Sequence, residues 1–182
     1  MERIREVLVG QMRVGKGGPE SALVDSQSVP STSKGGVRGY DRGKKVKGRK
    51  RHIVVDSQGS VLGVWVSSAD VSDARGARGV LGPVLSRYRT VRKVIADRAY
   101  DKEGLSEWLQ QEFGVKLDVV WRWSVGFVVL PRRWLVERSL AWIMGCRRLS
   151  RCYDGLCEAE ASWIKWACVR WLVRRIARMD KC

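Results

Sequence analysis

The chain has 182 residues, 45% of them hydrophobic, which suits one domain with a buried core, or one such domain plus a small appendage. Its 35 Lys and Arg against 19 Asp and Glu give a formal charge of +16, which favours nucleic acid as partner over an anionic membrane surface. No stretch approaches the ~20 apolar residues of a membrane span, and the N-terminus lacks the apolar core of a signal peptide, so a soluble intracellular protein is expected.

The first part of the chain predicts a helix followed by three antiparallel strands. Apolar residues at helical spacing indicate a short helix over residues 2–13. The first strand, residues 22–25, ends in Asp25, and the stretch from there to Arg51 is so rich in Gly, Lys and Arg that it is predicted to be a basic loop. Two β-branched runs separated by residues 57–60 then indicate a hairpin, which supplies the other two strands.

Strands and helices alternate in the remainder of the chain. An apolar strand leads to Asp97, and Pro131 fits the first turn of a long helix. The predicted order is three strands, helix, strand, helix, strand, helix, helix, which indicates an α/β fold with a mixed sheet. The strands after the first are predicted over residues 52–56, 61–67, 91–96 and 117–120, and the helices from about 73 to 88, 105 to 113, 131 to 149 and 158 to 179.

Beyond residue 130 the chain carries all five cysteines and five of its nine tryptophans. The odd number of cysteines and the lack of a Cys-x-x-Cys pattern favour reduced thiols over disulfides or zinc. The tryptophans fall in predicted helices, where core packing is expected and base stacking is the lesser alternative. His52 is the only histidine, and with no nucleophile beside it we expect a strand residue rather than a catalytic base.

Three acidic residues are candidate metal ligands and catalytic residues: Asp25, Asp97 and Glu137. The two aspartates each end an apolar strand, where a carboxylate needs hydrogen bonds, a partner or a metal; the alternative is a turn or helix cap. On one predicted helix, Arg133 and Arg148 flank Glu137, or else form a solvated face. Packed across the strand ends, these acids would bind Mg²⁺, and two ions ~4 Å apart can activate a water or 3′-hydroxyl against a phosphodiester.

The predicted basic loop is the candidate DNA-binding element. Its interspersed glycines would let backbone and side chains approach phosphates closely. A flexible solvated loop is the alternative. The candidate DNA-binding residues are Lys44, Lys45, Lys47, Arg49, Lys50 and Arg51, together with Arg133 and Arg148.

Seven segments carry a resemblance to a known family: residues 25–29, 35–41, 43–52, 69–73, 95–100, 126–134 and 136–138, the last leading to Arg147-Arg148-Leu149. In order and spacing they closely resemble transposases of bacterial insertion sequences in the group numbered five, over the chain from about residue 20 onward. The resemblance implies a ribonuclease-H-like mixed sheet flanked by helices, with a C-terminal helical extension. It also implies Mg²⁺, with Mn²⁺ as an alternative, the triad Asp25, Asp97 and Glu137, and Arg133 at the arginine position of the signature around the glutamate.

The resemblance implies metal-dependent DNA cleavage and strand transfer in transposition. The implied partners are double-stranded transposon ends and target DNA, bound by a homodimer in a synaptic complex. The implied location is the bacterial cytoplasm, at the nucleoid. Only 24 residues precede Asp25, fewer than the family usually carries. We therefore expect a helical remnant and linker over residues 1–20 and a catalytic domain over 21–182, with a segment from an upstream reading frame as a further candidate partner. Residues 121–125 also depart from the family pattern. The alternatives are a nuclease without joining activity and a truncated remnant that only binds DNA non-specifically.

Overall fold

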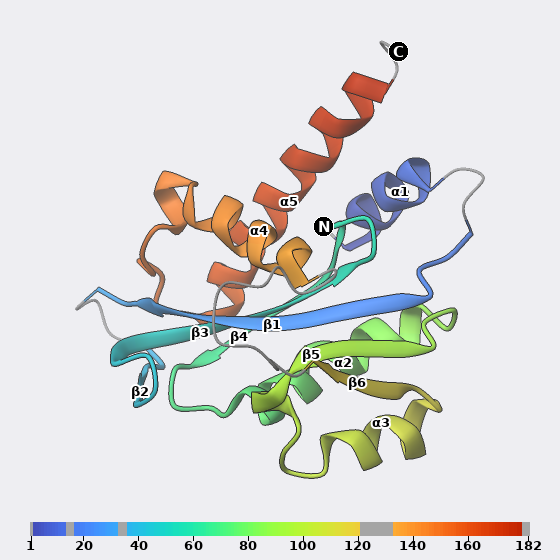
Figure 1. The fold of residues 1–182 in the computed structure, drawn as a ribbon. Helices are drawn as coiled ribbons and strands as arrows, with labels where there is room; N and C mark the ends of the chain where they lie inside the picture. Colours follow the sequence, from blue (N-terminus) through green and yellow to red (C-terminus); the bar gives the residue numbers. More distant parts are fainter. Residues whose placement is uncertain (1, 14–16, 33–35, 121–132, 180–182) are drawn as a thin grey trace, which may run out of the picture.

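The computed structural model describes residues 2–13, 17–32, 36–120 and 133–179 (Figure 1). At its centre is a six-stranded sheet in which β2, β3, β1, β5 and β6 are neighbours in that order, and β4 pairs with β3. As predicted, β1, β3 and β4 are antiparallel, whereas β5 runs parallel to β1 and β6 parallel to β5. The strands are β1 Ser21–Pro30, β2 Gly39–Asp41, β3 Val46–Asp56, β4 Val61–Ser68, β5 Lys93–Asp97 and β6 Lys116–Val120.

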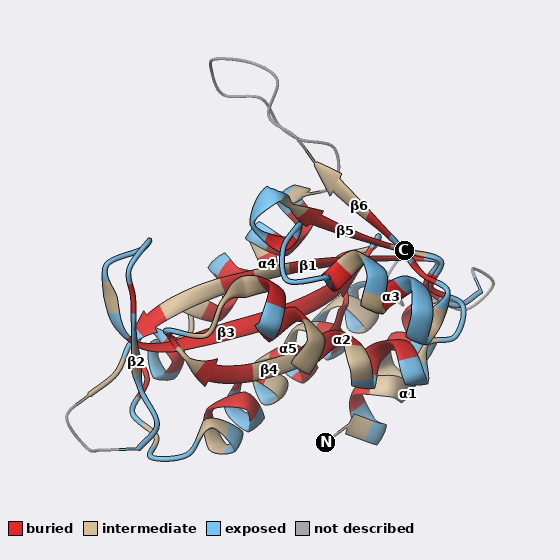
Figure 2. Cartoon of the chain, turned by 90° about the horizontal axis from the view of Figure 1, so that it is seen from below, coloured by how far each residue is buried: buried red, intermediate tan, exposed pale blue. Residues whose placement is uncertain are grey.

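Helices cover both faces of the sheet. α4 and α5 lie on one face and α2 and α3 on the other (Figure 1), and a hydrophobic cluster fills the space on each side. The central strands are accordingly the most buried part of the molecule (Figure 2). Among the described residues no helix is both long and apolar enough to span a bilayer. The helices are α1 Glu2–Met12, α2 Asp73–Arg87, α3 Leu105–Phe113, α4 Arg133–Met144 and α5 Cys157–Met179, with short 3-10 turns at Arg98–Tyr100 and Arg147–Leu149.

The region predicted as a basic loop is largely strand. β1 does not end at Asp25 but continues to Pro30, and β3 begins at Val46. The two strands pair in register from Ala22 opposite Asp56 to Pro30 opposite Gly48, and β2 adds a short hairpin strand at the far end. The loop prediction was wrong because Lys and Arg are usually solvated, whereas here several of them have partners inside the protein.

A buried ion cluster ties β3 to α5. Arg49, Arg51 and Glu160 are 1%, 0% and 1% exposed. Arg51 Nε donates to Glu160 Oε1 at 2.6 Å, and Arg51 Nη1 donates to the carbonyl of Leu149 at 2.7 Å. Arg49 Nη1 lies 3.5 Å from Glu160 Oε2, and the Arg49 guanidinium donates to three backbone carbonyls at 2.6–2.9 Å. One carboxylate and four backbone carbonyls therefore stabilise the two positive charges inside the fold.

Lys50, between these two arginines, is also buried, and its ammonium donates to the Val71 carbonyl at 2.8 Å. It forms ion pairs with Asp73 at 3.2 Å and Asp41 at 3.3 Å. The expectation that Arg49, Lys50 and Arg51 lie in a surface loop is therefore wrong, and their contact with phosphates stays a prediction. Lys44, Lys45 and Lys47 are exposed around the β2–β3 turn.

α2 packs close against the sheet because two of its glycines face it. Ser72 caps the helix by accepting a backbone hydrogen bond, which confirms the predicted start. A Cβ atom at Gly76 would lie 2.0 Å from the His52 ring, and one at Gly79 would lie 2.8 Å from Trp65. His52 is buried in β3, as expected of a strand residue. The glycines that weaken the helix in isolation thus permit its packing.

The ends of the chain pack against one another. α1 lies along α5, and Val9 and Met12 join the larger hydrophobic cluster. Arg5 of α1 is 2% exposed and donates to the Val61 carbonyl at 3.0 Å. The domain division at residue 20 stays a prediction. The four cysteines among the described residues are free thiols, as expected.

Candidate active site

The strand register brings Asp25 and Asp97 together. β1 and β5 pair in parallel with Leu23 opposite Ile95, and continuing that register by two residues places Asp25 opposite Asp97. Leu23 and Ile95 belong to the hydrophobic cluster beneath α4 and α5. Because side chains two residues apart in a strand share a face, both carboxylates point toward α4.

Arg133, in the first turn of α4, lies between two of the candidate carboxylates. Its Nη2 atom is 3.7 Å from Asp97 Oδ2 and 3.5 Å from Glu137 Oε1. The prediction that Arg133 and Glu137 share one face of a helix is therefore confirmed. The charges of Arg133 and Asp97 also act on the pKa of Asp25, which the former lowers and the latter raises. Two strands and one helix thus bring the three predicted acids around a single guanidinium.

Asp25 is the most buried of the three acids. Burial, the largest cause, and the charge of Asp97 raise the pKa of its carboxyl. The backbone N–H of Ser26, which donates to Asp25 Oδ1 at 2.7 Å, and the charges of Arg133 and Lys44 oppose that increase, and the resulting pKa is about 6. A buried carboxylate that remains under-compensated in its charged form is a good position for a cation.

Asp97 and Glu137 are more accessible, with side chains 33% and 54% exposed. Asp97 Oδ1 accepts from the backbone N–H of Ala99 at 2.9 Å, so this residue also caps the short turn that follows β5. One oxygen of Asp97 therefore caps this turn, which was the alternative to a catalytic role, and its other oxygen faces Arg133.

The donor set fits hard divalent cations, since all three side chains are carboxylates. Among the described residues, no three acids are close enough to share an ion as they stand. The guanidinium between Asp97 and Glu137 provides the positive charge instead. These oxygens are therefore suited to a metal that competes with Arg133 for them.

Sequence reasoning missed Ser26 and Tyr100 near Asp25, and it named Lys44 only as a DNA-binding residue. Lys44 Nζ donates to the Ser26 carbonyl at 3.0 Å, and Ser26 Oγ donates to Asp73 at 2.6 Å. Tyr100 is 1% exposed, and burial together with the charge of Asp25 raises its pKa well above the usual range. The sequence around these residues gave no local signal of the cluster, because their contacts depend on the fold.

Arg148 does not lie on the helix face of Glu137. α4 ends at Met144, before Gly145, instead of continuing to residue 149. Arg148 falls in the next 3-10 turn, pairs with Asp154 at 2.7 Å and stacks over Trp163 with its guanidinium carbon 5.3 Å from the ring centroid. The prediction that placed Pro131 in the first turn of this helix lies outside the described residues.

Comparisons with known proteins identify the family to which the chain belongs. The family described as "Transposase DDE domain" matches residues 16–172. A Burkholderia cepacia protein described as a candidate transposase for insertion sequence element IS402 is 28% identical over 144 residues, which cover 74% of this chain and 67% of that protein.

Two solved structures share the fold. The catalytic core domain of BIV integrase aligns with a TM-score of 0.50 and 14% identity, over 84% of this chain and 82% of that one. The catalytic domain of Mos1 mariner transposase aligns with a TM-score of 0.51 and 12% identity, over 100% of this chain and 89% of that one. The mixed sheet is thus ribonuclease-H-like. With the family match over residues 16–172, the chain belongs to the transposase DDE domain family, as a DNA-cleaving enzyme of the bacterial insertion-sequence type.

Proposed function

We propose that Asp25, Asp97 and Glu137 are the catalytic residues and hold two Mg²⁺ ions, or Mn²⁺ in their place, for DNA cleavage and strand transfer during transposition. The observation that carries this proposal is the position of Arg133, within 3.7 Å of Asp97 and 3.5 Å of Glu137. Bound ions would lower the pKa of an attacking water or 3′-hydroxyl and stabilise the leaving oxygen of the phosphodiester.

The protein's own groups prepare this site. Hydrogen bonds from the backbone N–H groups of Ser26 and Ala99 fix one oxygen of Asp25 and of Asp97. Arg133 offsets the repulsion between the acids, and once they are neutralised its guanidinium is free to donate to phosphate oxygens. Arg133 therefore serves both the acids and the DNA backbone.

The proposed partner is double-stranded DNA, at transposon ends and at the target, bound by a homodimer in a synaptic complex at the nucleoid. Lys44, Lys45 and Lys47 are proposed to contact phosphates because they are exposed beside the strand that carries Asp25. Replacing all three with alanine should weaken binding to any duplex sequence and flatten the salt dependence by a slope of ~0.9 per lost contact. An unchanged slope would exclude them from the interface.

The decisive experiment replaces each acid by its amide. Asp25→Asn, Asp97→Asn and Glu137→Gln should each abolish Mg²⁺-dependent nicking of a duplex that carries the terminal repeat, because each removes a charged ligand. DNA affinity should stay within about threefold of the parent, since non-specific binding depends on the basic surface. Asp101→Asn, an exposed acid just beyond the turn after β5, is the matched control and should cleave normally.

An amide variant that nicks at the parental rate would remove its residue from the site. A parent chain that binds DNA but never nicks it, with any divalent ion, would instead favour the remnant that only binds DNA. Nicking without joining of a 3′-hydroxyl end to target DNA would identify a nuclease.

A further inference from the structure

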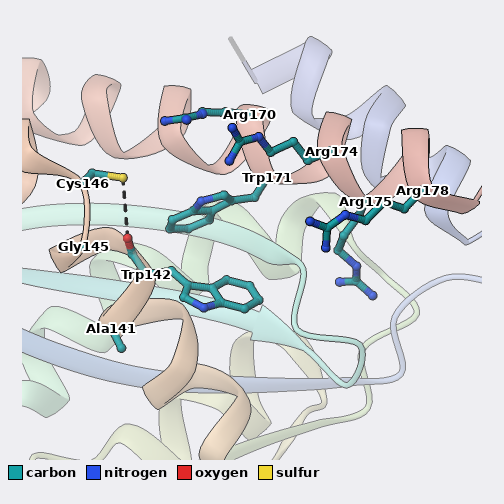
Figure 3. A pocket seen from close by; sticks show the side chains of 9 residues that line it. All are labelled: Ala141, Trp142, Gly145, Cys146, Arg170, Trp171, Arg174, Arg175 and Arg178. Carbon is teal, nitrogen blue, oxygen red and sulfur yellow. Dashed lines mark hydrogen bonds between the residues drawn. The ribbon is translucent and has the colours of Figure 1, made fainter.

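A groove between α4 and α5 lies outside the candidate active site. Its volume is about 500 Å³, and none of its lining residues is acidic. α4 and the turn after it supply one wall, and the C-terminal half of α5 supplies the other (Figure 3). This α4–α5 groove is lined by Ala141, Trp142, Gly145, Cys146, Arg170, Trp171, Arg174, Arg175 and Arg178.

Three of the groove's arginines form a row along α5. Arg170, Arg174 and Arg178 are spaced four residues apart and all are exposed. On a helix this row extends ~12 Å at 1.5 Å per residue. In the described part of the chain none of the three forms an ion pair, while Arg175 donates one hydrogen bond to the Gln58 carbonyl at 3.1 Å. The row is thus a set of like charges without a counter-ion.

Aromatic faces complete the groove. Trp142 is 40% exposed, although tryptophans here were expected in the core, and its ring centroid lies 5.4 Å from that of Trp171. One turn back on α4, the Arg138 guanidinium lies between two indoles, 4.5 Å from Trp134 and 4.6 Å from Trp142. Two exposed indoles of α4, with the Arg138 guanidinium between them, therefore line the approach to the groove, where Trp142 meets Trp171 edge to face at 62°.

The groove begins close to the candidate catalytic residues. Ala141 lies one helical turn beyond Glu137 on α4, ~6 Å along the axis and on nearly the same face. Successive arginines of the row lie ~6 Å apart along the α5 axis, a spacing that their flexible side chains can match to consecutive phosphates of an extended single strand. A strand that leaves Glu137 along α4 would reach the groove within a few nucleotides.

We propose that the α4–α5 groove binds a single DNA strand next to the cleavage site, with Arg170, Arg174 and Arg178 on successive phosphates and Trp142 stacked on an unpaired base. The proposal rests on the DNA-cleaving function proposed above and adds a second contact surface to it. DNA is favoured because it offers repeated negative charge and planar bases together. The groove itself is basic, with four arginines and no acidic residue in its lining, so a polyanion is a better occupant of it than a second copy of this basic chain.

The first test removes the charge row. The full chain with Arg170, Arg174 and Arg178 replaced by alanine should bind single-stranded oligothymidylate at least tenfold more weakly in a fluorescence anisotropy titration without divalent ions. Its salt slope should fall by about 2, from ~0.7 for each of three phosphate contacts. The matched control replaces three exposed arginines on or just after α2, across the sheet: Arg75, Arg89 and Arg92.

The second test addresses stacking. Trp142→Ala should lower the affinity for the same oligonucleotide at least about fivefold, the lower end for one stacked base. Trp142→Phe should retain most of that affinity because it keeps an aromatic face. Trp166→Ala, which removes a tryptophan of α5 that is 52% exposed and outside the groove, should have little effect. Photocrosslinks from 5-iodouracil in the oligonucleotide should map to Trp142 or Trp171.

Equal losses in both arginine triple variants would overturn the proposal, because they would reflect net charge alone. Unchanged DNA affinity combined with an altered sedimentation coefficient in the groove variants would assign the groove to a second copy of the chain, and would likewise overturn it. These measurements need no catalysis. If the proposed metal-dependent function is wrong, the parent chain will not nick DNA, yet the groove variants will still bind the oligonucleotide more weakly than the parent does.

Discussion

Glu160→Gln should strongly destabilise the protein, because Glu160 is the buried counter-ion of two arginines of β3. The three side chains are no more than 1% exposed, and the carboxylate oxygens lie 2.6 Å from Arg51 and 3.5 Å from Arg49. The amide keeps the size of the side chain but leaves two desolvated guanidinium groups without a neutralising charge. Breaking a buried ion pair from one side typically costs ~3–5 kcal/mol of unfolding free energy.

The assay is urea unfolding followed by far-UV circular dichroism, with the melting temperature as a second readout. For a domain of this size the loss corresponds to a melting temperature lower by about 6–20 °C, at ~2–4 °C per kcal/mol. Glu158→Gln, at an exposed position one half-turn earlier in α5, is the matched control and should change stability by less than about 0.5 kcal/mol. A cost below about 1 kcal/mol for Glu160→Gln would refute the assignment of Glu160 as the essential counter-ion.

Two further predictions concern the packing of α2 on β3. Gly76→Ala should destabilise the protein despite the better helix propensity of Ala, because the new Cβ would meet the His52 ring at 2.0 Å. Gly82→Ala is the control: its Cβ would have no neighbour closer than 4.0 Å, so it should be neutral or stabilising in thermal unfolding. Burial lowers the pKa of His52 to about 3, so the unfolded chain binds an extra proton below pH ~6.5 and stability falls as the pH drops. His52→Gln should flatten this dependence between pH ~6.5 and about 4 in urea titrations; an unchanged slope would contradict it.

The sequence predicts the order of the strands and helices apart from β2, because most of these elements leave local signals, and it singles out the three acids as candidates. Apolar runs with β-branched residues indicate strands, and an acid after such a run is unusual. Asp97 does end β5 as expected. Asp25 instead lies in the middle of β1, which continues through a largely polar stretch to Pro30. Strand pairing with β3 stabilises that extension, and pairing has no local sequence signature.

The basic segment shows most clearly what local patterns miss. A run of Lys and Arg with glycines has the composition of a solvated loop. Among the described residues, Arg38, Arg42, Lys44 and Lys45 fit that prediction, whereas Lys47 is exposed but belongs to β3. Arg49 and Arg51 are buried because they pair with Glu160. In the sequence Glu160 lies 109 residues after Arg51, so no local pattern indicates the pair. Similarly, the exposed tryptophans of α4 and α5 were expected in the core, because helical spacing does not indicate how wide a buried face is.

The link between β3 and α5 also affects how the chain folds during synthesis. Arg51 leaves the ribosome well before Glu160, and at ~5–20 residues per second the 109 residues between them take about 5–20 s to be made. Through that interval Arg49 and Arg51 of β3 lack the carboxylate with which they pair in the folded protein. The sheet therefore completes only after the last helix emerges, and a nascent chain that stalls before residue 160 would present an unfinished β3 to chaperones and proteases.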